Sequence, residues 1–103
     1  MQKRDFMKVF SKDISEKKEF DRIGYHYERI FYYAPVHCGV YRMTRKEDGR
    51  FSGYEVVRGK RRLNPDGTVV YNYPSDEDFG TYGFYGYHLD RLLVYLDEWM
   101  ELE

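Results

Sequence analysis

The sequence has little of what marks several large classes of protein. Its 103 residues include one cysteine, Cys38, which excludes an internal disulfide, and only three prolines, with no proline-rich linker. No apolar run approaches the length of a membrane-spanning helix, and no apolar signal segment stands at the N-terminus. We therefore expect a reduced protein of the cytoplasm that does not associate with a membrane.

An excess of charge of one sign is also lacking. The chain has 17 basic and 18 acidic residues and a formal net charge of −1. Proteins that hold duplex nucleic acid through its phosphates usually carry a clear positive excess, so this balance disfavours that class and leaves room for a local basic patch. The length is that of one domain and no repeat or linker interrupts it, so we predict a single domain over residues 1–103.

Aromatic residues, in contrast, are abundant. They make up 19% of the chain, with twelve tyrosines and seven phenylalanines. Disordered chains are poor in such residues, and large rings fill a small core well. Because tyrosine also has a strong preference for strands, the composition favours a folded, β-rich domain.

Alternating patterns and turn signals predict an antiparallel sheet in the middle of the chain. Asp48-Gly49 is a hairpin signal, because tight connections between strands need residues that accept positive φ. Asn64-Pro65-Asp66-Gly67 predicts a second turn. The strands that these turns connect are expected at residues 25–33, 39–45, 51–59 and 68–73.

The C-terminal segment changes to a helical period. Its apolar residues recur at intervals of three and four, and charged residues occupy the other side, as in an amphipathic helix that starts near His88. We therefore predict an α+β fold, in which an antiparallel β-meander of three to five strands carries this C-terminal amphipathic helix on one face. The apolar positions are Leu89, Leu92, Leu93, Leu96, Trp99 and Met100.

Two other segments have weaker patterns. Phe6, Met7, Val9, Phe10 and Ile14 fit either a strand or a helical face, and Ser15 is positioned to cap one helical turn. The stretch from residue 73 to residue 87, YPSDEDFGTYGFYGY, has glycine at every third position from 80 to 86, which fits no regular element. We expect it to join the last strand to the helix, with Phe79 buried and at least one of its glycines at positive φ.

The second half of the chain resembles a family of small uncharacterised proteins of bacteria, phages and mobile elements. The resemblance consists of a (Y/F)EV element at Tyr54-Glu55-Val56, then basic residues, then a YPxxxDFGx(Y/W)(A/G) block that begins at Tyr73-Pro74 and includes Asp78-Phe79-Gly80. A final helix follows. The resemblance implies an α+β fold and a phage or mobile-element origin, and it implies no activity.

Candidates for catalysis or metal binding find little support in the sequence. Asp76, Glu77 and Asp78 are adjacent, and neighbours in an extended chain point to opposite faces, so they favour an exposed turn over a metal site. His37 and Cys38 are adjacent too, which does not suit a base and its nucleophile. We expect no enzyme, no cofactor and no metal; only a cleft that joins His26 or His37 to Asp78 would favour an enzyme.

A basic segment is the best candidate for a binding surface. It lies close in sequence to two tyrosines, and arginine with tyrosine is typical of both protein hot spots and single-strand binders. We predict a small non-enzymatic protein-interaction module, with a homodimer as one variant. The alternative is a protein that binds single-stranded nucleic acid through a basic hairpin and tyrosines. The candidate binding residues are Arg58, Lys60, Arg61, Arg62, Tyr71 and Tyr73.

Overall fold

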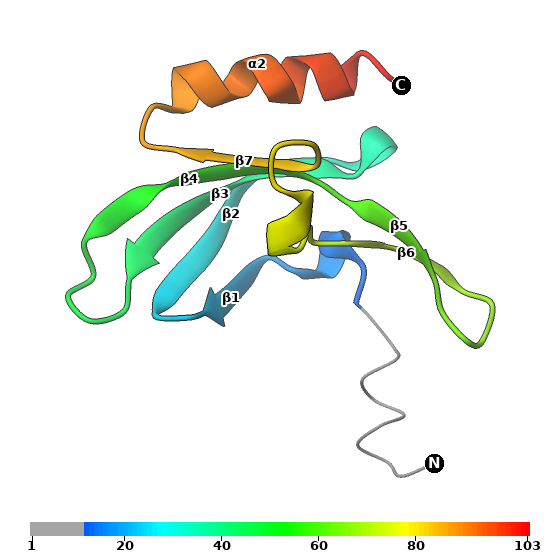
Figure 1. Ribbon diagram of the computed structural model, residues 1–103, viewed down its shortest axis with the longest axis horizontal. Helices are drawn as coiled ribbons and strands as arrows, with labels where there is room; N and C mark the ends of the chain where they lie inside the picture. Colours follow the sequence, from blue (N-terminus) through cyan, green and yellow to red (C-terminus); the bar gives the residue numbers. More distant parts are fainter. Residues whose placement is uncertain (1–11) are drawn as a thin grey trace, which may run out of the picture.

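A five-stranded antiparallel sheet forms the centre of the protein, in the order β1-β2-β3-β4-β7 (Figure 1). The computed structural model describes residues 12–103; the interpretation of residues 6–10 as a strand or helical face lies outside them. Each neighbouring pair of strands is antiparallel. The strands are β1 (Glu19–Arg22), β2 (Tyr25–Tyr33), β3 (Cys38–Arg45), β4 (Phe51–Arg58) and β7 (Gly83–Gly86).

The hairpin between β3 and β4 forms where Asp48-Gly49 predicts it. Gly49 has φ +69°, a conformation that glycine accepts without steric cost. The Asp48 carboxylate accepts a hydrogen bond of 3.0 Å from the backbone amide of Arg50 and is also paired with Arg45. These local contacts set the register in which Tyr41 lies opposite Glu55.

One face of the sheet, the helix face, is covered by α2 (Leu89–Met100), which packs mainly on β3, β4 and β7 (Figure 1). His88 is the residue that precedes the first turn of this helix, as the sequence predicts. The six apolar positions expected on the inner side all contact this layer of the core. The predicted α+β architecture is therefore confirmed.

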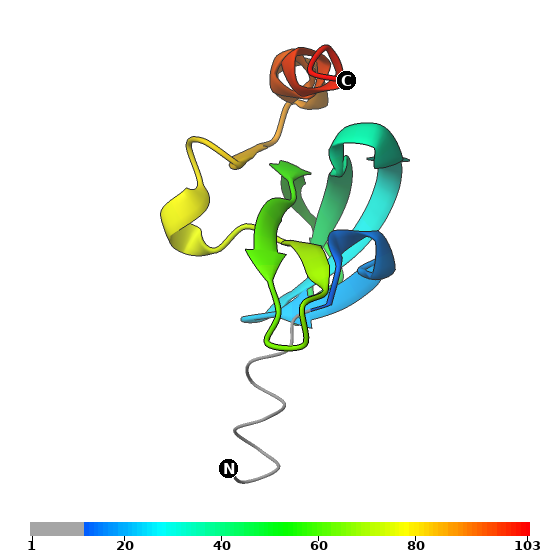
Figure 2. The same ribbon diagram turned by 90° about the vertical axis from the view of Figure 1, so that its right-hand side faces the viewer.

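The opposite face of the sheet carries a second cluster, rich in tyrosine, and we call it the aromatic face. Ile14, Tyr27, Tyr41, Met43 and Val57 are buried there. A two-stranded hairpin and short 3-10 turns pack against this cluster; Figure 2 shows them away from the helix. They are β5 (Lys60–Leu63), β6 (Val69–Asn72), η1 (Ile14–Glu16) and η3 (Asp76–Asp78), while η2 (Ala34–Val36) connects β2 to β3.

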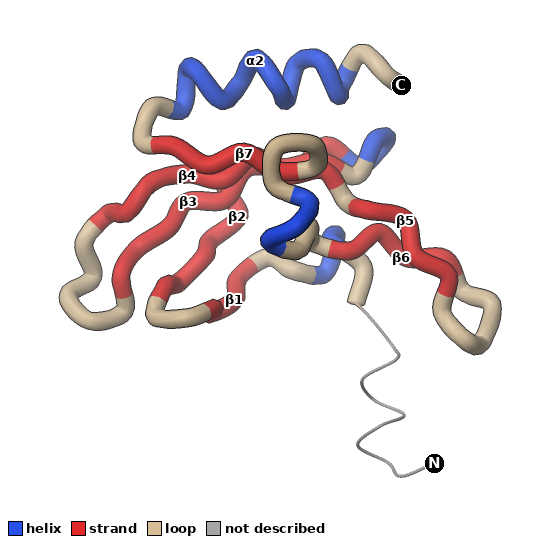
Figure 3. Tube along the Cα trace, viewed as in Figure 1, coloured by secondary structure: helices blue, strands red, loops and turns tan. Residues whose placement is uncertain are grey.

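β1 and β5 form where no strand was predicted, and three of the predicted segments differ from the prediction. The strand expected at 68–73 forms as β6, but it pairs only with β5 and leaves the main sheet (Figure 3). Its place beside β4 is taken by β7, from the glycine-rich stretch that we expected to be a plain junction. β7 is an edge strand, and an edge strand tolerates glycine better than an interior strand does. Gly83 also leaves room for the Phe79 ring, because a Cβ added at Gly83 would lie only 2.9 Å from that ring.

The third difference is at the start of the described chain. The helical turn begins at Ile14, one residue before Ser15, and Asp13 caps it by accepting a hydrogen bond from the Ser15 amide. The second carboxylate oxygen of Asp13 accepts from the amide of Tyr71, 3.0 Å away, and so fastens η1 to β6. Within residues 12–103 no helix has both the length and the apolar character needed to cross a bilayer.

Candidate functional site

A pocket of about 320 Å³ opens on the aromatic face. Strand alternation brings its walls together, because Glu55 of β4 faces the same side as its cross-strand neighbours Tyr41 and Tyr85. A volume of this size suits a small molecule or a single side chain. The lining residues are Arg22, Ile23, Tyr25, Tyr27, Met43, Glu55, Asp76, Phe79 and Tyr85.

Glu55 is the buried charged group of this pocket. It is only 7% exposed, in the middle of a strand whose next two residues are valines. The hydroxyl of Tyr73 donates a hydrogen bond of 2.5 Å to Oε1. Burial raises the pKa of the carboxyl, and the hydrogen bond from Tyr73 and the nearby Arg22 oppose that rise only in part.

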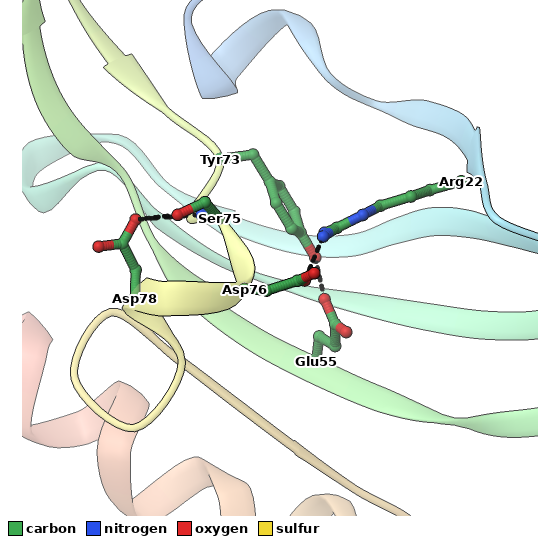
Figure 4. A network of polar contacts seen from close by, with 6 residues as sticks. All are labelled: Arg22, Glu55, Tyr73, Ser75, Asp76 and Asp78. Carbon is green, nitrogen blue, oxygen red and sulfur yellow. Dashed lines mark hydrogen bonds and ion pairs between the residues drawn. The ribbon is translucent and has the colours of Figure 1, made fainter.

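An ion pair lies next to this carboxyl. Arg22, from β1, is paired with Asp76 of η3, and Figure 4 shows the pair beside the hydroxyl of Tyr73. The guanidinium and the Asp76 carboxylate compensate each other. No basic side chain of the described residues lies within ion-pair distance of Glu55 itself.

The turn that supplies Asp76 is built by the acids of the SDED sequence. The Ser75 amide and hydroxyl both donate to Oδ2 of Asp78, a capping box that holds η3 (Figure 4). Oδ1 of Asp78 pairs with Lys60, 2.9 Å away, and this pairing is the largest cause of the lowered pKa of Asp78. Asp78 thus accepts a hydrogen bond from a turn amide, and Gly80 has φ +101°, both as predicted. Phe79 is half-buried against the aromatic cluster, less buried than predicted.

The Glu55 carboxyl in the pocket can pair with a positive charge or exchange a proton. A carboxyl with a raised pKa can serve as an acid or a base in chemical terms, but the lining residues include no histidine, cysteine, serine or lysine to act with it. Within the described part of the chain, no three side chains of the metal-ligating types converge on one point.

Four of the six candidate binding residues, Lys60, Arg61, Arg62 and Tyr73, line one hollow of about 360 Å³ beside η3, whereas Arg58 and Tyr71 are not among its lining residues. Arg61 and Arg62 are exposed on β5, while Lys60 is paired with Asp78. The ring of Tyr71 stacks on His37 with centroids 3.5 Å apart, and the hydroxyl of Tyr73 is bonded to Glu55. The guanidinium of Arg58 lies 6.0 Å from the ring centroid of Tyr82. Lys60, Arg61 and Arg62 thus face solvent along β5, whereas Arg58 is partly buried at the end of β4. The two tyrosines pack against the aromatic cluster.

His26, His37 and Cys38 contact residues that hold the fold together. His26 contacts Asp21 and Glu19, at 2.6 and 2.7 Å, and these two carboxylates, Asp21 first, raise its pKa. His37 stacks on Tyr71, and Asp78 is bonded to Lys60, so no described contact joins either histidine to Asp78. Cys38 is the first residue of β3 and fully buried, and burial raises the pKa of its thiol to about 11, which keeps it protonated at neutral pH.

A second hollow lies on the helix face, between α2 and β2. It has a volume of about 360 Å³ and mostly apolar walls. Ile30 and Phe31 are 46% and 42% exposed there, next to a register shift between Arg29 and Phe31 that turns them toward the helix side. The groove is lined by Ile30, Phe31, Val40, Leu89, Leu93, Leu96, Asp97 and Met100.

Comparison of the chain with family models, with curated proteins and with solved structures found no match. The resemblance of the second half to small phage and mobile-element proteins therefore stays a prediction. The chemistry of the pocket and the groove carries the functional argument.

The sequence analysis missed the pocket on the aromatic face and the groove beside α2. Glu55 had a local signal, since a lone acid in a strand between Tyr54 and two valines is unusual at a position that alternation places in the core. The groove had none, because it depends on how far α2 extends across the sheet. Asp76 also appeared only as part of an acidic turn, and its pairing with Arg22 spans 54 residues of sequence.

Proposed function

We propose that the protein is a small interaction module, and that the groove between α2 and β2 binds a positively charged amphipathic segment of another protein. The observation that carries the proposal is the uncovered half of the helix face. Strands are spaced about 4.8 Å apart, so five of them span roughly 20 Å, whereas one helix with its side chains is about 10 Å wide. One helix covers half of such a sheet.

The exposed side chains beside the groove, which a bound partner would cover, are apolar. Phe31 and Ile30 form one wall, and Leu93 and Met100 on α2 are half-buried opposite them. Val94 is 56% exposed on the adjoining row of the helix. Such a strip suits an amphipathic helix that lies beside α2 and presents apolar residues at intervals of three and four.

The rim of the groove is acidic. Asp90, Asp97 and Glu101 share a row of α2 with Val94, because residues three and four apart lie on one side of a helix. Glu28 is exposed on β2 across the groove. This charge favours a partner with lysine or arginine beside its apolar residues, and it disfavours a homodimer through this face, which would bring like charges together.

The test is a titration with two helical peptides that share one leucine pattern and differ in charge. The lysine-rich peptide is expected to shift the amide resonances of residues 30–31 and 89–101, and the glutamate-rich peptide is not. Phe31→Asp should abolish those shifts, whereas Leu63→Asp, a change at an exposed apolar residue of β5, should leave them intact. Equal binding of both peptides, or of the peptide to Phe31→Asp, would remove the proposal.

Light scattering of the protein alone tests the alternative that a second copy of this chain, and not another protein, occupies the groove. A dimer that Phe31→Asp converts to a monomer, together with no response to the lysine-rich peptide, would identify a homodimer in place of a foreign partner.

The second candidate function is the binding of single-stranded nucleic acid by the hairpin of β5 and β6. One observation favours it: Lys60, Arg61 and Arg62 are all exposed on β5, and the hairpin extends away from the main sheet (Figure 1). The inward-facing rings of Tyr71 and Tyr73 offer less surface for stacking on bases than the hypothesis requires.

A further inference from the structure

The pocket on the aromatic face contains a carboxyl group, Glu55, that is paired with no cation of the described residues. Removing a carboxylate from water is costly unless a positive charge or several donors compensate it. Glu55 receives one hydrogen bond, from Tyr73, to Oε1; its Oε2 has no hydrogen bond from the described residues and is open to solvent in the pocket. Because Arg22 is already paired with Asp76, an ionised Glu55 leaves the pocket with one net negative charge.

The walls around this carboxyl are aromatic. Tyr25, Tyr27, Phe79 and Tyr85 line the pocket together with Met43. Ring faces attract cations, most strongly where water is excluded. A carboxylate at the floor of a small aromatic pocket is complementary to a compact organic cation in both charge and shape.

Two structural features hold the rings in place. The Tyr85 hydroxyl donates a 2.8 Å hydrogen bond to the carbonyl of Ser52, and its ring lies against Gly53, where an added Cβ would meet Cε2 at 2.8 Å. Tyr27 stacks on Phe20 with centroids 4.7 Å apart. The pocket is thus largely formed before a ligand arrives, which reduces the entropy lost on binding.

We propose that this pocket binds an ammonium group, with Glu55 as its counter-ion and the surrounding aromatic rings as its walls. The ammonium belongs either to a free amine or to a lysine side chain of another protein, since both offer the same charge and size. An anionic ligand would have to displace Asp76 from Arg22 and would lie next to Glu55. A neutral ligand would leave the carboxylate uncompensated.

Binding of a cation is linked to the proton of Glu55. In the empty pocket burial raises the pKa of this carboxyl, and a bound ammonium lowers that pKa, so affinity increases with pH and binding releases protons in the acidic range. The titratable and charged groups that face Glu55 come from every neighbouring element. They are Arg22, Tyr27, Tyr41, Tyr73, Asp76 and Tyr85.

The experiment compares choline with its uncharged isostere 3,3-dimethyl-1-butanol, followed by amide resonances of the pocket and by calorimetry in two buffers. Choline should bind at least about tenfold more tightly than the alcohol, as expected for a cation over desolvated rings. Proton release should accompany choline binding in the acidic range. Two further pairs of ligands distinguish a free amine from a lysine side chain: n-butylammonium and Nα-acetyl-lysine methylamide, each with its trimethylated form. Tighter binding of the first pair indicates a free amine, and tighter binding of the second pair indicates a lysine side chain.

Matched variants locate the site. Glu55→Gln keeps an acceptor for the Tyr73 hydroxyl and removes the charge, so it should fold, bind choline at least about tenfold more weakly and release no proton. Glu77→Gln, an exposed acid of the neighbouring turn, should bind like the parent protein.

Three results would each overturn the proposal. The alcohol binding as tightly as choline would mean an apolar pocket with no charge preference. Acetate binding that is lost in Arg22→Gln would mean an anion site. No change in the pocket resonances with choline or any of the four other ammonium compounds at tens of millimolar would mean that Glu55 has a purely structural role.

Discussion

Tyr73 connects two parts of the molecule through one hydroxyl. Its ring packs edge-on against Phe20, Tyr27 and Tyr41, with centroids 5.1 to 6.4 Å away, and its hydroxyl donates to Glu55. Burial is the main cause, and the neighbouring Glu55 carboxyl the second cause, of a Tyr73 pKa well above its usual value. The tyrosine therefore remains protonated, and so a hydrogen-bond donor, at neutral pH.

Tyr73→Phe is expected to destabilise the protein by about 1–3 kcal/mol near neutral pH, because a buried carboxylate loses its hydrogen-bond donor. The hydrogen bond favours the charged form, so its loss raises the pKa of Glu55 further. Since a protonated carboxyl needs the donor less, the cost should be smaller at about pH 4. Urea unfolding at the two pH values measures both effects.

Glu55→Gln provides the control for this prediction. In that background no carboxylate remains, so Tyr73→Phe should cost less at neutral pH, and a double-mutant cycle gives the difference. An identical cost in both backgrounds would show that the tyrosine acts through its ring packing alone.

The β5–β6 hairpin separates its charged and apolar sides. Arg61 and Arg62 are exposed, while Tyr71 on β6 packs inward on His37 and is fixed through its amide to Asp13. Asp66 holds the turn by accepting from the amide and hydroxyl of Thr68. The hairpin is thus a rigid support for its basic residues.

If this hairpin binds single-stranded nucleic acid, Arg61→Ala with Arg62→Ala should weaken binding and flatten its salt dependence. The slope of log K against log salt should fall by about 0.7 for each phosphate that the variant no longer neutralises. Fluorescence titration of a labelled oligonucleotide at several salt concentrations measures it. Lys46→Ala with Arg50→Ala removes the same charge from the β3–β4 hairpin and should have no such effect; absence of binding at low salt excludes the hypothesis.

At the scale of the whole molecule, ionisable groups of two kinds set the dependence of stability on pH. In one kind, carboxylates have pKa values below their usual range because partners such as Lys60 or Arg45 favour the charged form. Their stabilisation is present above the unfolded value near 3.8 and is lost as pH falls through the folded value. They are Asp13, Asp21, Asp48, Asp66 and Asp78.

His26 and Glu55 are of the other kind, with raised pKa values. Their contribution is fully present below the unfolded values of 6.5 and 4.5, and it is lost as pH rises through the folded values. The melting temperature is therefore expected to be highest at mildly acidic pH and to fall on both sides.

Thermal melts across the acidic and neutral range check this profile. His26→Gln should reduce the decline of the melting temperature above about pH 6.5. Glu55→Gln should reduce the decline that begins near pH 4.5. A stability that still rises steadily from acidic to neutral pH in the parent protein would contradict the expectation.

Much of the local structure of this protein follows from its sequence alone, although β1, β5 and β7 form where no strand was predicted. Period-two alternation in residues 39–45, the turn residues at Asp48-Gly49 and at Asn64–Gly67, and the helical spacing from Leu89 to Met100 each identify an element. These signals suffice because backbone φ preferences and the burial of one side act within a few residues. The α+β class follows from them.

Which strands share a sheet and which side chains meet depends instead on tertiary contacts. β7 displaces β6 beside β4 because pairing there depends on competition between distant segments, and the edge position accepts glycines that no local rule favours. The same competition brings Arg22, Glu55 and Tyr73 together from three separate parts of the chain. The pocket and the groove are stabilised by burial and by contacts between residues far apart in the chain, so no local sequence pattern predicts either of them.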